Sequence, residues 1–369
     1  MPLSLGKPTT SCCDPRTTSG HFQLQEGCMK RLISAVAGLA LVTAACQDFN
    51  TPSSESPEVP SIDAAPELDS AQVQATASAQ IWAVVDQNGN LIHGNRTTGV
   101  VKLGPGQYEV SFNRNLTSCA YVATTRNAYS QAIQASTAGG HLSANGVYVE
   151  TKNQGGGLTD GPFDLVVTCG GTGIRYAVVG YTANLVRSTA GTTLTFLGSG
   201  RYNVRFASSV AGCAYIATLA DPGSALVFNP SGVYTGSGPD ANTVYIETKN
   251  PGGGLQDGVP FHLALICSST ANARYAVVRA TGVKQRSSSG MTAAKLSIGN
   301  FQINSSNLGI SACATVATRG SINTAVPFNP GTVEIVPGPT SNSIDVQTRE
   351  LLFFGGALNS LAFHAASVC

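Results

Sequence analysis

The stretch at 104–112 reads GPGQYEVSF, a glycine-rich turn followed by alternating apolar and polar residues. In an extended chain Tyr108, Val110 and Phe112 lie on one side, and the polar residues between them lie on the other. This period of two predicts a β-strand with one buried face and one solvated face. The stretch therefore points to antiparallel β-structure.

The same pattern returns later in the chain. A close copy, GSGRYNVRF, stands at 198–206, and a weaker one, GNFQI, at 299–303. The stretch CAYVAT at 119–124 likewise returns as CAYIAT at 213–218 and as CATVAT at 313–318. The repeat length of about 100 residues exceeds the roughly 20–50 residues of solenoid repeats. We therefore expect three domains, each with its own core, at residues 80–169, 170–267 and 268–369.

The composition favours short strands joined by turns. Glycine accounts for 41 of 369 residues, 42% of residues are hydrophobic and only 11% are charged. Asn88-Gly89, between two apolar runs, predicts a two-residue hairpin turn. Each repeat holds six or seven short strand patterns and no helical one. The predicted fold is all-β, with three tandem small antiparallel β-sandwich domains, or partly closed barrels as the alternative.

An export signal precedes the repeats. Residues 29–46 read MKRLISAVAGLALVTAAC, in which Lys30 and Arg31 precede an apolar run that is too short to span a bilayer. The small residues before Cys46 resemble the signal peptide of bacterial lipoproteins. The resemblance implies that Cys46 is lipidated and anchors the chain in the cell envelope. With Gln47 next, it implies the outer membrane. An ordinary secretory signal and a short membrane anchor are the alternatives.

Two further segments flank this signal. Residues 1–28 are interpreted as a start assigned too early or as a disordered leader. Their Cys12, Cys13, His21 and Cys28 match no familiar structural-zinc spacing, so no metal is expected there. Residues 47–79 carry acidic residues without Lys or Arg, which predicts a disordered acidic tether.

Six cysteines fall as one pair in each repeat. In an exported chain, an even and repeated count predicts disulfide bonds. We expect the pairs Cys119–Cys169, Cys213–Cys267 and Cys313–Cys369. Each bridge would close a loop of about 50 residues and stabilise the fold by roughly 4 kcal/mol.

A glycine-rich segment is the most conspicuous local motif. It reads TKNQGGGLTDG at 151–161 and TKNPGGGLQDG at 248–258. A phosphate-binding loop needs glycines that lead into Lys-Ser/Thr at the start of a helix, whereas here Lys comes first and a strand follows. One carboxylate in each loop is too few for the six to eight oxygen ligands of calcium. Two interpretations remain: a plain surface loop, or a ligand-contacting loop that uses Lys152, Asp160, Lys249 and Asp257.

Three aromatic residues open the repeats at matched positions: Trp82, Tyr176 and Tyr275. Exposed rings at such positions could stack on sugars. The other interpretation places them in the cores or at the seams between domains.

The remaining candidates for acid–base chemistry are sparse. His262 and His364 occupy equivalent strand positions, where the first repeat has Asp164, and we expect this position to point outward. Glu150 and Glu247 also match each other, and alternation places them on a solvated face. The chain carries no G-x-S-x-G and no H-E-x-x-H motif.

The third repeat departs from the pattern where its glycine-rich loop should be. Residues 351–354 are Leu-Leu-Phe-Phe in a place that is polar in the other repeats. Phe353 and Phe354 are therefore either buried against a neighbouring domain or exposed as a contact patch.

These observations favour a binding protein over an enzyme. The formal net charge of +1 argues against nucleic acid as a partner. The repeats resemble modules of uncharacterised exported bacterial proteins, marked by A-V-V, G-x-G-x-Y-x-V-x-F and C-A-Y-x-A-T. This resemblance supports the domain count and implies no activity. We expect a non-enzymatic surface lipoprotein without a cofactor or metal, whose partners are the bilayer through Cys46 and a glycan or envelope protein. The alternative is an enzyme acting on an envelope or extracellular polymer.

Overall fold

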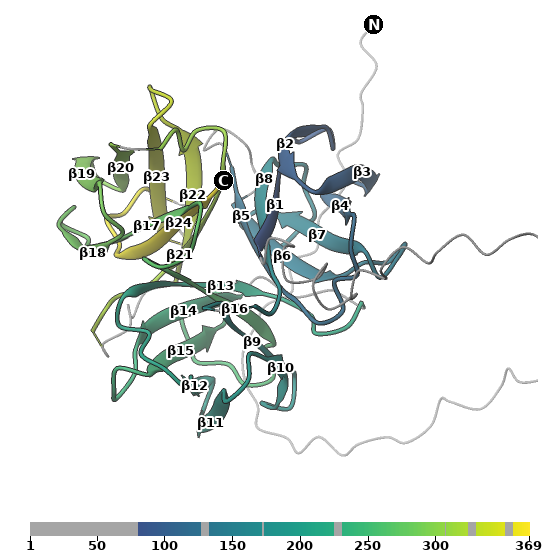
Figure 1. The fold of residues 1–369 in the computed structure, drawn as a ribbon, viewed down its shortest axis with the longest axis horizontal. Helices are drawn as coiled ribbons and strands as arrows, with labels where there is room; N and C mark the ends of the chain where they lie inside the picture. The colour runs from purple at the N-terminus through teal and green to yellow at the C-terminus, as the bar shows by residue number, and fades with distance from the viewer. Residues whose placement is uncertain are drawn as a thin grey trace, which may run out of the picture. The chain divides into compact units, whose positions relative to one another are not determined.

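The structure is a computed structural model that describes residues 80–126, 133–171, 173–224, 231–306, 308–323, 330–350 and 357–369. Every regular element in these ranges is a β-strand, as Figure 1 shows. The predicted all-β class is confirmed. The three repeats lie within one compact unit of the chain.

Each repeat contributes eight strands, where six or seven were expected. The first repeat holds β1 (Gln80–Val85), β2 (Leu91–Asn95), β3 (Thr97–Gly104), β4 (Gln107–Phe112), β5 (Ala120–Thr125), β6 (Gln134–Gly139), β7 (Gly146–Lys152) and β8 (Phe163–Thr168). The second holds β9 (Arg175–Val179), β10 (Leu185–Ser188), β11 (Thr193–Gly198), β12 (Arg201–Arg205), β13 (Cys213–Leu219), β14 (Gly232–Ser237), β15 (Thr243–Lys249) and β16 (Phe261–Cys267). The third holds β17 (Ala273–Val278), β18 (Lys284–Ser287), β19 (Met291–Ser297), β20 (Asn300–Ser305), β21 (Ala314–Arg319), β22 (Gly331–Pro337), β23 (Ser343–Glu350) and β24 (Phe363–Val368).

The strands of each repeat form two antiparallel sheets of four strands. We name the first set the inner sheets, with strand orders β2-β1-β8-β5, β10-β9-β16-β13 and β18-β17-β24-β21. The outer sheets have the orders β3-β4-β7-β6, β11-β12-β15-β14 and β19-β20-β23-β22. The same strand order therefore recurs in all three repeats.

A core fills the space between the two sheets of each repeat. In the first repeat, Tyr108, Val110 and Phe112 of β4 pack with Tyr121 of β5 and Phe163 of β8. These residues are at most 2% exposed. The alternation in GPGQYEVSF thus identifies the residues of β4 that face the core, as predicted. The prediction of a solvated opposite face was wrong at Glu109, which is 0% exposed because its carboxylate accepts from the backbone N–H groups of His141 and Leu142.

The three predicted disulfides are confirmed: Cys119–Cys169, Cys213–Cys267 and Cys313–Cys369. In each repeat the bridge joins the edge strand of the inner sheet to the last strand, which lies beside it. Each bridge therefore closes a long chain segment within a single inner sheet.

The turn at Asn88-Gly89 lies where it was predicted, but it is longer than two residues. The loop runs from Asp86 to Asn90, with Gly89 at a φ of 86°. The Asp86 carboxylate accepts hydrogen bonds from the backbone N–H groups of Asn88 and Asn90, both at 2.8 Å. The backbone N–H of Gly89 donates to the Asp86 carbonyl at 3.1 Å, so the side-chain contacts add to a backbone turn, and the loop has five residues because Gly89 follows this turn in the left-handed region.

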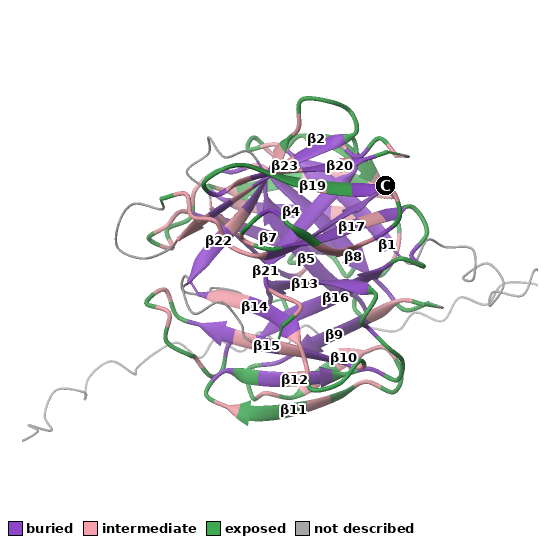
Figure 2. Ribbon diagram, turned by 90° about the vertical axis from the view of Figure 1, so that its left-hand side faces the viewer, coloured by how far each residue is buried: buried purple, intermediate pink, exposed green. Residues whose placement is uncertain are grey.

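Three strands of each inner sheet are buried on both faces, whereas the outer edge strands β2, β10 and β18 are exposed or half-buried. One face of the buried strands lies in the core of its own repeat, and the other joins a core shared by all three repeats, which includes Val122, Ile216 and Val316. Figure 2 shows β13 and β16 buried and the outermost strands β11 and β19 largely exposed. The buried strands accordingly read as mainly apolar runs rather than as alternating patterns.

The edge strands β5, β13 and β21 meet where the three repeats converge (Figure 1). Each of them pairs with one strand of its own sheet, so the N–H and C=O groups of its other edge need partners elsewhere. A buried group left unpaired would cost roughly 1–3 kcal/mol. Side chains of the neighbouring repeat supply these partners.

Two sets of seam hydrogen bonds run around the three repeats in the same direction. In the first set, a backbone N–H of one repeat donates to a side chain of the next: Tyr121 N to His262 Nδ1 (2.9 Å), Tyr215 N to His364 Nδ1 (3.0 Å) and Thr315 N to Asp164 Oδ2 (2.7 Å). In the second set, a threonine hydroxyl accepts from a backbone N–H: Ala123 N to Thr218 (2.9 Å), Ala217 N to Thr318 (2.7 Å) and Ala317 N to Thr124 (2.8 Å). The same hydroxyls donate to the carbonyls of Ala123, Ala217 and Ala317.

The expectation that Asp164, His262 and His364 point outward was wrong. All three are 0% exposed and lie at the seams between repeats. We call these the first seam (first and second repeats), the second seam (second and third) and the closing seam (third and first). Because β8, β16 and β24 are covered on both faces, these polar side chains face a neighbouring repeat rather than solvent.

The seam histidines make the stability of the fold depend on pH. Burial holds the pKa of both His262 and His364 well below the ordinary 6.5. Below about pH 6.5 the unfolded chain therefore binds protons that the folded chain does not, and the free energy of unfolding falls. Urea unfolding at pH 7.5 and pH 5.0 should show this loss.

Replacing His262 by Asn keeps an acceptor near the position of Nδ1 and removes the titration. We expect H262A to lower the free energy of unfolding at both pH values, because it removes the acceptor for the Tyr121 N–H. In H262N the free energy of unfolding should differ less between pH 7.5 and pH 5.0 than in the wild type. His93 is exposed, so H93N should keep the wild-type pH dependence. An equal pH dependence in H262N and the wild type would contradict this assignment.

Candidate functional site: a groove at the closing seam

The closing seam carries a groove of about 570 Å³. Its walls come from the end of β1 and the following loop in the first repeat and from the end of β22 in the third. The lining residues are Val84, Val85, Asp86, Gln87, Asn88, Ile92, Arg126, Pro162, Val336 and Pro337. The volume lies within the roughly 300–1,000 Å³ that small-molecule sites occupy.

The loop beside the groove differs in sequence from the equivalent loop of the second repeat. At the first seam, Tyr181 takes the loop position of Gln87, and its hydroxyl donates to Asp221. The backbone N–H of Asp221 in turn donates to the Thr137 carbonyl of the first repeat. Tyr181 thus ties its loop to the seam, whereas Gln87 is exposed.

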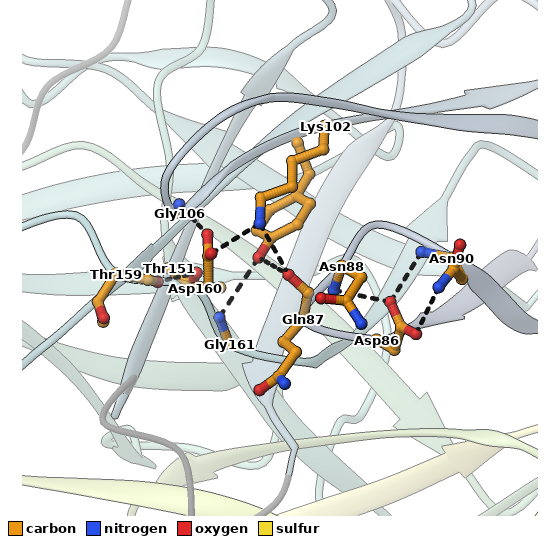
Figure 3. A network of polar contacts seen from close by, with 11 residues as sticks. Asp86, Gln87, Asn88, Asn90, Lys102, Gly106, Thr151, Thr159, Asp160 and Gly161 are labelled. Carbon is orange, nitrogen blue, oxygen red and sulfur yellow. Dashed lines mark hydrogen bonds and ion pairs between the residues drawn. The ribbon is translucent and has the colours of Figure 1, made fainter.

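A polar network fixes the loop that forms one wall of the groove (Figure 3). The Gln87 carbonyl accepts hydrogen bonds from Lys102 Nζ at 3.2 Å and from the Tyr108 hydroxyl at 2.9 Å. Lys102 also forms an ion pair with Asp160 at 2.7 Å. The hydrogen bond between them raises the pKa of Lys102 and lowers that of Asp160, so both stay charged at neutral pH.

Asp160 gives the glycine-rich segment a structural role. Its carboxylate accepts from the backbone N–H of Gly106 at 2.8 Å, which holds the segment against the β3–β4 turn. Gly106 has a φ of 65°, and a Cβ there would lie 2.6 Å from the carbonyl oxygen of Thr151. The second glycine of G-x-G is therefore required by this close approach.

The other repeats close the same turn in the same way. Asp257 accepts from the backbone N–H of Gly200, and in the third repeat Ser360 accepts from Gly299 at 3.0 Å. Asp160 and Asp257 are thus engaged with their own turns. The segment is a folded loop with internal hydrogen bonds, such as Gly157 N to Asn153 Oδ1 at 3.0 Å.

Lys152 and Lys249 do not lie on the loop surface. They end β7 and β15, with side chains 3% and 5% exposed, and each pairs with a glutamate at 2.8 Å: Glu150 and Glu247 respectively. The prediction that these glutamates lie on a solvated face was wrong, since their side chains are 1% and 14% exposed.

Tyrosines complete these two buried pairs. The Tyr148 hydroxyl donates to Glu150 at 3.1 Å, and Tyr245 donates to Glu247 at 2.9 Å. Burial, together with the neighbouring glutamate, raises the pKa of both tyrosines. The pattern Tyr-x-Glu-x-Lys on one strand face could have indicated these groupings from the sequence.

The third repeat rearranges the same cluster. Gln347 replaces the glutamate, and Glu334 on β22 lies 3.4 Å from Arg349 instead. Burial raises the pKa of Glu334 to about 7, and Arg349 opposes this effect.

The three matched aromatic residues lie at the seams and are nearly buried. Trp82, Tyr176 and Tyr275 are 7%, 5% and 2% exposed. The Tyr176 hydroxyl donates to the Ser118 carbonyl of the first repeat, and Tyr275 donates to Gly212 of the second, both at 2.6 Å. Their rings thus occupy the seam positions that the sequence offered as the alternative to sugar stacking.

Several predicted residues cannot be compared with the structure. Cys46, Phe353 and Phe354 lie outside the described residues, as do the signal segment and the tether. In the part of the chain that is described, no cluster of three or more His, Cys, Asp or Glu side chains could hold a metal ion. The same part contains no helix with the length and apolarity needed to cross a membrane.

The groove residues Asp86, Ile92, Arg126, Val336 and Pro337 were not singled out from the sequence. The sequence did carry a sign of this site, because the three repeats differ at one hairpin-loop position. The first repeat has Asp86 there, whereas the second has Gly180 and the third has Arg279. Such a difference between repeats acquires meaning only when the seam that it faces is known.

Comparisons of the chain with protein-family models, with curated proteins and with solved structures found no match.

A buried ion pair holds the floor of the groove. Both carboxylate oxygens of Asp164 accept from Arg126 Nη1, at 2.9 and 2.8 Å, and Arg126 Nη2 donates to the Ser311 carbonyl of the third repeat. Burial raises the pKa of Asp164, and Arg126 counteracts this effect. The closing seam thus uses an aspartate and an arginine where the other seams use a histidine.

Removing Arg126 should leave a buried carboxylate without its cation. We expect Arg126→Ala to lower the free energy of unfolding by roughly 3–5 kcal/mol, measured by urea unfolding with Trp82 fluorescence. The second repeat has Ala220 and His262 at the matching positions. The double variant Arg126→Ala/Asp164→His copies that pair and should recover most of the loss. A single variant as stable as the wild type would refute a stabilising role for the ion pair.

Proposed function

We propose that this chain is an exported, lipid-anchored envelope protein that binds a ligand in the groove at the closing seam. In this proposal, the three repeats are three tandem β-sandwich domains arranged around the shared core. The groove is the observation that carries the proposal, because it combines suitable volume with walls that the hydrogen-bond network and the Arg126–Asp164 pair hold in place.

The charged residues around the groove support binding rather than catalysis. Lys102 and Arg126 are each engaged with a carboxylate, and each also holds a backbone carbonyl of the groove walls or of the seam. Through these contacts the two charged side chains hold the loop at Gln87 and the closing seam in place. A preformed site of this kind binds without a large ordering cost.

Three disulfides support the exported location, since such bonds persist in oxidising compartments. The lipoprotein-like segment at 29–46 supports attachment through Cys46, and the acidic segment 47–79 would separate the groove from the membrane. The ligand class that fits an envelope location is a glycan or another envelope protein.

The anchor is tested by replacing Cys46 with Ser. The wild-type chain, expressed in a bacterial host, should incorporate labelled palmitate and partition into the detergent phase of a Triton X-114 extract. C46S should do neither, because it lacks the thiol that carries the lipid. Cys28→Ser, which changes a cysteine before the signal, serves as the control and should be labelled like the wild type. An unlabelled, soluble wild type would overturn the anchor.

The groove is tested by a charged substitution in its apolar wall. Ile92 lines the groove and is 51% exposed, so Ile92→Asp should fold and disrupt an apolar contact. Val186 occupies the matching hairpin position of the second repeat and is 44% exposed, so Val186→Asp is the matched control. On an array of envelope glycans and in pull-downs from envelope fractions, I92D should lose at least 10-fold in binding, and V186D should retain it. Equal binding by both variants would refute the groove as the site, and no binding by the wild type would refute a glycan or an envelope protein as the ligand.

A further inference from the structure

The lining of the groove combines apolar and charged residues. An apolar band is formed by Val85, Ile92, Pro162, Val336 and Pro337, which come from both repeats. The charged lining residues are Asp86, which is partly exposed, and Arg126, which is 9% exposed. A ligand in this groove therefore meets apolar side chains of both repeats and the exposed part of the Asp86 carboxylate.

Asp86 carries its negative charge at neutral pH. Its slight burial alone would raise the pKa, but the hydrogen bonds from the Asn90 side chain and from the backbone of Asn90, Asn88 and Gly89 outweigh this effect and lower the pKa. These bonds orient the carboxylate without neutralising it, because all of their donors are uncharged groups.

The cations near the groove are already balanced. Lys102 is paired with Asp160, and Arg126 is paired with Asp164. These two pairs cancel, so the charged side chains in and around the groove leave one net negative charge, that of Asp86.

The other seams lack this carboxylate. The matching loop position is Gly180 in the second repeat and Arg279 in the third, as the equivalent hydrogen bonds of the three hairpin loops show. A carboxylate at this loop position is thus found only at the closing seam among the three described hairpin loops, and there it lines the groove.

We propose that the groove binds a small amphiphilic cation, an aliphatic chain that ends in an ammonium group. The chain would lie along Ile92, Val336 and Pro337, and the ammonium group would face the Asp86 carboxylate. The inference rests on the groove being a binding site, as proposed above, and names a small amphiphile as its occupant in place of a glycan or an envelope protein. A charge-assisted hydrogen bond to Asp86 would supply selectivity, and the apolar band would supply contact area.

The test compares three probes of equal chain length. Octylammonium, octanol and octanoate are titrated into the full chain by calorimetry at pH 8 and low ionic strength, below their micellar concentrations. We expect octylammonium to bind at least 10-fold more tightly than octanol, and octanoate to bind more weakly than octanol.

The Asp86→Asn variant isolates the charge. Its side-chain oxygen still accepts from the backbone of Asn88 and Asn90, so the loop is retained. We expect D86N to bind octylammonium and octanol equally. Asp240 is an exposed aspartate of the second repeat, paired with Arg205 away from the groove. Asp240→Asn removes the same charge and should keep the wild-type preference.

The outcomes separate this inference from the function it rests on. If wild type binds octanol as tightly as octylammonium and I92D binds neither, the groove is a binding site and the cationic class is wrong. If D86N keeps the wild-type preference, the assignment to Asp86 is wrong. If none of the probes binds, the inference fails, while the glycan and pull-down assays still decide whether the groove binds other ligands.

Discussion

Three buried sheet edges are the constraint on which the rest of this structure depends. The strands β5, β13 and β21 each expose one edge of an inner sheet toward the other repeats, and the peptide groups there cannot reach water. Each repeat supplies the missing partners for its neighbour through a threonine and through a histidine or aspartate. Because every edge is completed by the next repeat, the seams form together and enclose the shared core.

The three seams have equivalent hydrogen bonds, but the closing seam uses different residues to make them. Consecutive repeats are joined by the chain at the first and second seams, whereas the closing seam joins repeats that are distant in sequence. At this seam Asp164 and Arg126 replace the histidine, and the Trp82 indole N–H has no partner among the described residues, where Tyr176 and Tyr275 donate hydrogen bonds. The groove lies at the seam whose residues have diverged most.

Much of the local structure was predictable from the sequence, and the errors share one cause. The alternation at 104–112 identified the core-facing residues of β4 correctly, although Glu109 on the opposite face is buried as well. The same reasoning failed for His262 and Glu150, which were assigned to solvent. Alternation separates two faces of a strand, but it does not show that both can be buried. Repeated polar residues on apolar strands, such as His262 and His364, were the available signal of contact between repeats.

The threefold repetition, the all-β class and the pairing of the cysteines could all be predicted from local sequence patterns. These properties follow from local periodicity and from the count of cysteines in each repeat, which do not depend on how the repeats meet. Only the tertiary structure decided the seams, the buried Tyr–Glu–Lys groupings and the groove. The groove brings Asp86 and Ile92 of the first repeat against Val336 and Pro337 of the third. Residues so far apart in the chain become neighbours only because hydrogen-bond completion of the sheet edges brings the last repeat back to the first.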